Sequence, residues 1–175
     1  MNIKNLLICV AVSALCGAPL LRAQATKQVT VNATVAEMLS LNVDVTTVTL
    51  AFAATDYDVN TGLATKAAVH ATTFSVTANR AWKLTVQPGA ASFTFTPTGT
   101  SVDPVKSVGA LSVRTGVVAY APFSGITSIP VATGTAGGSA KTGNIVPVDY
   151  QMTSSLATDP PGTYLVTLTY TLASQ

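Results

Sequence analysis

The chain has 175 residues, only 9% of them charged, and its mean hydropathy is +0.46. The charged fraction lies far below the roughly 25% of an ordinary soluble domain, and 28 threonines outnumber the 9 basic and 7 acidic side chains combined. Because few Lys, Glu and Arg residues are left to cover helix surfaces, an all-helical fold is excluded. The 48% of hydrophobic residues excludes intrinsic disorder, which combines low hydrophobicity with high net charge.

Residues 1–25 are predicted to be a cleaved secretory signal peptide. Lys4 supplies the positive charge, residues 6–15 form a short apolar run, and Ala23 and Ala25 are the small residues of a cleavage site. A lipoprotein signal at Cys16 is the alternative, but Leu15 stands where a lipobox needs a small residue. We therefore expect a mature domain of residues 26–175.

Removing this segment changes the charge and the cysteine count. The segment contains Lys4 and Arg22, the two basic residues that account for the net charge of +2. It also contains both cysteines, Cys9 and Cys16. The mature domain is then neutral and free of disulfides, so its charge gives no evidence for the basic patch that nucleic-acid binding would need, and no nucleic-acid partner is expected.

Apolar and polar residues alternate with a period of two along the mature chain, which predicts β-strands. The first strand covers residues 27–35, where one face carries Val29, Val31, Ala33 and Val35. Further strands are expected near residues 38–43, 47–52, 69–78, 82–87, 92–96, 110–115, 128–132 and 144–153.

The closing strand covers residues 164–172. One face of this strand is apolar and is assigned to the core: Tyr164, Val166, Leu168, Tyr170 and Leu172. Turn-forming Gly, Pro, Asn and Asp residues separate the strands, and residues 134–143 form a long loop. These features predict an all-β fold, a single antiparallel β-sandwich of about 8 to 10 strands.

The sequence offers no set of residues for catalysis or for a cofactor. His70 is the single histidine, which leaves no Ser-His-Asp arrangement and no zinc ligand set, and it is assigned to a strand end. Asp56, Asp58 and Asn60 alternate like the start of a calcium loop, yet the glycine and glutamate that such a loop needs are missing. A loop tightened by Asx turns is the preferred interpretation.

Trp82 and the tyrosines leave two interpretations open. Trp82 shares a strand face with Leu84 and Val86, which favours a place in the core over a sugar-binding platform. A secreted monomeric adhesin or carbohydrate-binding module, with a host or surface glycan as ligand, therefore stays as the alternative function.

The ends of the mature chain resemble the subunits of bacterial fimbriae. The resemblance rests on the alternating strand that follows the signal peptide and on a terminal Gly162-Thr-Tyr164 followed by alternating apolar residues. The absence of mature cysteines is closest in character to the alpha, or colonisation-factor, type of major subunit and to spore-coat-U-like secreted domains.

This resemblance implies a non-catalytic structural subunit of a filament on the bacterial cell surface. It implies an incomplete immunoglobulin-like sandwich, completed by donor-strand exchange when residues 27–35 of a neighbour insert, and assembly through a periplasmic chaperone and an outer-membrane usher. Such head-to-tail pairing gives an open homopolymer. The alternative is that residues 27–35 pair with their own sheet in a self-contained monomer.

Overall fold

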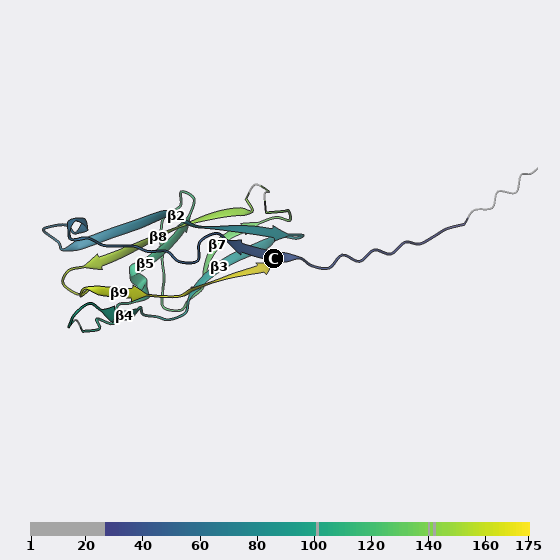
Figure 1. Cartoon of the computed structure of the whole chain (residues 1–175). Coiled ribbons are helices and arrows are strands. Elements are labelled where there is room, and N and C mark those ends of the chain that lie inside the picture. Colours follow the sequence, from purple (N-terminus) through teal and green to yellow (C-terminus); the bar gives the residue numbers. More distant parts are fainter. Residues whose placement is uncertain (1–26, 101, 140, 142) are drawn as a thin grey trace, which may run out of the picture. The chain divides into compact units, whose positions relative to one another are not determined.

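The computed structural model describes residues 27–100, 102–139, 141 and 143–175. The chain divides into a unit of residues 1–35 and a compact unit of residues 36–175. The compact unit is all-β and antiparallel, with ten strands and two short 3-10 turns among the described residues, which confirms the predicted fold class (Figure 1). The predicted signal peptide and both cysteines lie outside the described residues.

The larger sheet has five strands in the order β1-β2-β8-β5-β6. Its bounds are β1 Leu39–Val43, β2 Leu63–Ala78, β8 Ile145–Ser155, β5 Leu111–Thr115 and β6 Ala121–Pro122. β2 pairs with β8 along most of its length, and the register shifts between Ala68 and Thr72 at a β-bulge. β1 pairs only with β2 among the described strands, so its other edge is unpaired.

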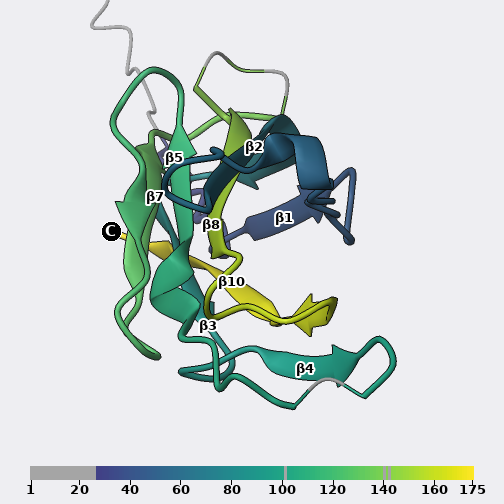
Figure 2. The same ribbon diagram turned by 90° about the vertical axis from the view of Figure 1, so that its left-hand side faces the viewer.

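The second sheet has three strands in the order β10-β3-β7, and a third sheet pairs β4 with β9. Their bounds are β10 Leu168–Ser174, β3 Trp82–Pro88, β7 Ile129–Gly134, β4 Thr94–Pro97 and β9 Gly162–Leu165. Figure 2 shows the two larger sheets facing each other, with β1 and β10 on the same side of the sandwich. β10 pairs only with β3 in the described chain, so it too presents an unpaired edge.

The core lies between the two larger sheets and follows the period-two pattern. β3 contributes Trp82, Leu84 and Val86, all fully buried, while β2 and β8 face them with Phe74, Val76, Ala78, Val146, Val148, Tyr150 and Met152. Trp82 donates its indole N–H to Asn144 Oδ1 at 3.3 Å. Trp82 is therefore a core residue, as its place in the pattern predicted.

Several strand boundaries differ from the sequence-based expectation. β2 begins at Leu63, ahead of the expected start at residue 69, and the short β6 was not anticipated. The expected closing strand is divided into β9 and β10, with residues 166 and 167 outside both. Residues 47–52 and 27–35, both expected to be strands, belong to none of the three sheets.

Two buried carboxylates stabilise irregular parts of the sandwich. Asp149, almost fully buried, accepts hydrogen bonds from the His70 amide at 2.6 Å and from Arg114 Nε at 2.8 Å, and so supports the bulge in β2. Asp159 pairs with Lys106 and also accepts from the Ser155 amide at 2.9 Å. Burial by itself would raise the pKa of each carboxyl, but these partners outweigh burial and hold the pKa below its ordinary value.

These shifts predict an acid-dependent loss of stability. Because the pKa of Asp159 is lower in the folded chain than in the unfolded chain, its contribution to stability is present above the ordinary value of 3.8 and is lost as the pH falls through that value toward the lower folded-state pKa. Asp159→Asn should therefore melt well below wild type at neutral pH, and the gap should narrow on acidification. Thermal melts of both proteins across this range measure the effect, and a constant gap would contradict it.

Candidate functional site: an open apolar groove

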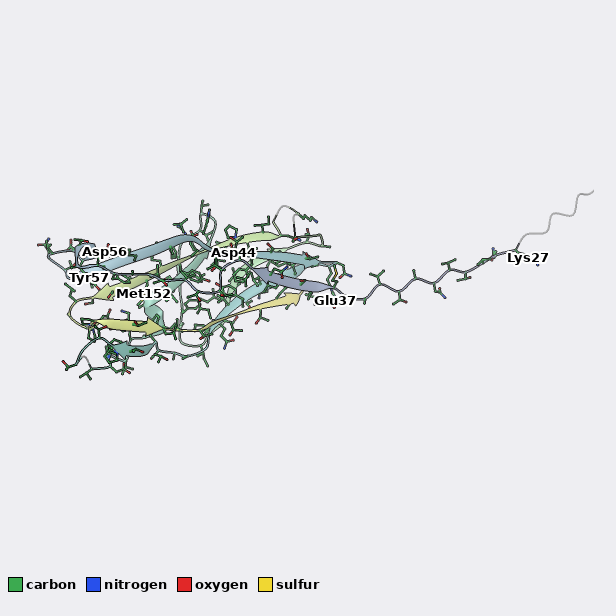
Figure 3. All side chains as sticks on the ribbon, viewed as in Figure 1. Lys27, Glu37, Asp44, Asp56, Tyr57 and Met152 are labelled. Carbon is green, nitrogen blue, oxygen red and sulfur yellow. The ribbon has the colours of Figure 1, made fainter. Side chains whose placement is uncertain are left out.

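A groove of about 620 Å³ lies in the compact unit between the unpaired edges of the two larger sheets. One wall is formed by β1 and by residues 44–52, which follow it. Apolar side chains line this wall: Leu41, Val43, Val45, Val48 and Leu50. Figure 3 marks Asp44 between Glu37 at one end of the sandwich and Asp56 and Tyr57 at the other, the course that this wall follows.

Asp44 and Val45 still bond to β2, but the rest of the wall segment, residues 46–52, has the pattern of a strand without a partner. Val48, Leu50 and Phe52 are half-buried, while Thr47, Thr49 and Ala51 are exposed. No backbone hydrogen bond is made by residues 46–52 within the described part of the chain. Since backbone N–H and C=O groups beside an apolar surface are normally paired, this wall has the properties of a strand whose neighbour is missing.

The opposite wall is formed by β9, β10 and the residues between them. It carries Tyr164, Val166, Leu168 and Tyr170. The floor is formed by core residues that remain accessible from the groove: Phe74, Phe93, Leu111, Tyr150 and Met152. Leu172, the fifth residue assigned to this face, packs against the core beyond the groove.

The tyrosine hydroxyls that line the groove are uncharged. Tyr150 and Tyr170 share a hydrogen bond between their hydroxyls at 2.7 Å, and burial raises the pKa of both. Burial also raises the pKa of Tyr164 to about 12, helped by the nearby charge of Asp159, and its hydroxyl donates to the carbonyl of Pro160. All three phenols stay protonated at neutral pH. The groove therefore suits a neutral, apolar segment.

The closing-strand residues predicted for the core do pack against it, but they are not fully buried. Tyr164, Val166, Leu168, Tyr170 and Leu172 share one face and pack against the core cluster, yet each is only half-buried. Four of them line the open groove, and on that side β9 and β10 have no neighbouring strand, while their other edges pair with β4 and β3.

The predicted interface residues are solvent-exposed. Residues 27–35 are extended, and Val29, Val31 and Val35 are 83–86% exposed. Isolated exposed valines are common, but three on one face of a segment outside every sheet form an apolar row that gains by burial.

The weak metal candidates are engaged in loop structure. Asp58 Oδ1 accepts from the amides of Asn60 and Thr61 at 3.0 and 2.8 Å, which is the expected Asx-type turn. Asp56 pairs with Lys66 at 2.7 Å and accepts from the Ala53 amide. No three His, Cys, Asp or Glu side chains among the described residues gather in a way that could hold a metal ion.

His70 lies in the bulge of β2 and not at a strand end. Its φ of 50° is unusual for a residue other than glycine. The backbone N–H of His70, and not its ring, makes the contact with Asp149. The contact that His70 makes with Asp149 therefore supports the bulge of β2 and does not involve the imidazole ring.

Sequence reasoning identified the apolar row but missed the groove wall. Residues 44–52 were expected to include an ordinary paired strand, and the sequence carries no signal that separates a paired strand from an unpaired one. The alternation in residues 47–52 was the available signal, and it predicts burial of one face correctly.

Protein-family models give no match to this sequence, and neither do curated protein sequences. Within the described residues, no helix has the length and apolar character needed to cross a membrane. The groove and residues 27–35 are therefore the features of the chain that bear on its function.

Proposed function

We propose that the protein is a non-catalytic structural subunit of a bacterial surface filament, with residues 27–35 of each copy inserted into the groove of the next. The observation that carries this proposal is the pair of complementary defects in one chain. The groove lacks a strand between two unpaired edges, and residues 27–35 form an apolar strand pattern outside every sheet.

The two surfaces match in length and chemistry. Residues 27–35 span about 30 Å when extended, which is enough to run along the unpaired residues 46–52 of the wall. The inserted face carries Val29, Val31, Ala33 and Val35, and burying each valine contributes about 1.5–3 kcal/mol. The opposite face, with Thr30, Asn32 and Thr34, would remain at the surface.

Strand addition also satisfies the backbone of the groove wall. An inserted strand offers N–H and C=O groups to residues 46–52 and to the free edge of β10. Because the donated segment and the groove are different surfaces, the contact is heterologous and continues from copy to copy as an open filament.

The location and partners follow from this proposal. Filament subunits act outside the cell, in agreement with the predicted signal peptide. An empty apolar groove on an exported monomer is an aggregation hazard, so a periplasmic chaperone would cover it until an outer-membrane usher brings the next subunit.

The adhesin alternative receives less support. Trp82 is fully buried and cannot form an exposed platform for a sugar. The groove is lined mainly by aliphatic and aromatic side chains, whereas a glycan needs many polar partners.

Peptide complementation tests the proposal. A variant lacking residues 26–35 should stay monomeric, and a synthetic peptide of residues 27–35 should raise its melting temperature. At a hundredfold excess over Kd the gain is about 2.7 kcal/mol, a shift of about 4 °C or more. A scrambled peptide of the same composition is the control, and equal shifts from both peptides would contradict insertion.

A further inference from the structure

Asn79, in the turn between β2 and β3, makes three hydrogen bonds to the start of the compact unit. Asn79 Nδ2 donates to the Ala36 carbonyl at 2.7 Å, the Met38 amide donates to Asn79 Oδ1 at 2.9 Å, and the Asn79 amide donates to the Met38 carbonyl at 3.1 Å. Next to it, Arg80 pairs with Glu37 at 3.3 Å and donates to the Gln175 carbonyl at 3.2 Å. We call the three Asn79 hydrogen bonds and the Arg80–Glu37 ion pair, which together hold residues 36–38, the Asn79 anchor.

The sequence is also compatible with a second arrangement, in which residues 27–35 fold back on β1 as a hairpin. If residues 36–38 formed a three-residue turn, residues 27–35 would run back antiparallel along the free edge of β1. Val35 would then lie opposite Leu39, Ala33 opposite Leu41, and Val31 opposite Val43. All of these residues share the inward face, so the hairpin would have the correct phase to cover part of the groove from within the same chain.

Two features of the chain disfavour that hairpin. A three-residue hairpin loop normally ends in a residue with positive φ, usually glycine, whereas residues 36–38 are Ala, Glu and Met. The turn would also break the three hydrogen bonds of Asn79, and these bonds keep residues 36–38 as a direct continuation of β1.

We propose that the Asn79 anchor prevents the subunit from closing its own groove and so keeps residues 27–35 available for a second copy. This inference rests on the proposed function. It assigns to Asn79 a role in the choice between self-closure and assembly, in addition to its role in the turn.

A disulfide trap in the full chain distinguishes the two arrangements. Asn32 and Asn42 would lie opposite each other on the outward face of the hairpin, so Asn32→Cys with Asn42→Cys reports self-closure by an intrachain disulfide. This pair is placed in the otherwise wild-type chain and in a release variant that carries Asn79→Ala and Met38→Gly. Non-reducing gels and mass spectrometry identify the disulfide, and electron microscopy scores polymers.

We expect polymers without the intrachain disulfide in the wild-type background. In the release variant we expect the intrachain disulfide and a fall in polymer yield of about tenfold or more, since several hydrogen bonds are lost and a turn residue is gained. Asn79→Ala alone should give an intermediate result, and it guards against a folding defect of the double change. The Asn42→Ala variant, which alters an exposed asparagine on β1, should polymerise as wild type.

The outcomes separate the two proposals. Polymers of equal yield in both backgrounds, with no intrachain disulfide in either, would overturn the role of Asn79 and leave the filament proposal intact. An intrachain disulfide in the wild-type background, with protein that remains monomeric, would overturn the filament proposal itself.

Discussion

Val31→Asp should abolish polymer formation while leaving the compact unit folded. Val31 is 84% exposed and lies outside every sheet, so the change costs the isolated subunit almost nothing. In an assembled filament the new carboxylate would enter a groove whose lining has no cationic side chain, and burying an unpaired charge is costly. Size-exclusion chromatography and electron microscopy of the exported protein measure the effect.

Thr30→Asp is the matched control for this prediction. Thr30 is the preceding residue and would face outward in the inserted strand, so its carboxylate stays in water and polymers should persist. Equal loss of polymers in both variants would show that the two faces of residues 27–35 are equivalent, which contradicts insertion as an alternating strand.

Trp82→Ala should destabilise the compact unit by about 3–5 kcal/mol, the range for removing a large aromatic side chain from a core. Trp82 is fully buried, and its loss also leaves the amide oxygen of Asn144 without its donor. Asn144 is itself buried and holds the carbonyls of Gly137 and Gly138 at 3.1 Å, so the neighbouring loop loses support as well. Urea unfolding gives the free energy directly.

Thr169→Ala provides the comparison on the adjacent strand. Thr169 is exposed on β10, so its replacement by alanine should lower the free energy of unfolding by about 0.5 kcal/mol or less. Similar losses at Trp82 and Thr169 would mean that the core does not lie on the face assigned to it.

The sequence carried the fold class because alternation and turn residues are local signals. β3 and β8 follow the period-two pattern closely; the inward residues of β3 form part of the core as expected, and those of β8 join them there. The start of β2 was placed too late because three of the six residues from Leu63 to Ala68 are alanines, which gives weak contrast between the two faces of the strand. The bulge at His70 was not predictable, since it depends on Asp149, a distant residue that satisfies its amide.

The groove could be predicted only in part. The apolar row of residues 27–35 and the inward face from Tyr164 to Leu172 are patterns within short segments, and both were found. Which edges remain unpaired depends on how the strands are ordered in space, and alternation in residues 47–52 does not encode that order. The contacts of the Asn79 anchor join residues that are separated by 41 to 43 positions in the sequence, so no local pattern predicts them.

Tracing the chain in filaments recovered from the native cell surface tests the central claim most directly. Electron cryo-microscopy at a resolution that distinguishes side chains would show which sandwich receives residues 27–35. We expect Val29, Val31 and Val35 of one copy to lie in the groove of the next, between residues 44–52 and β10. Residues 27–35 paired with their own β1, or protein found only as monomers at high concentration, would contradict it.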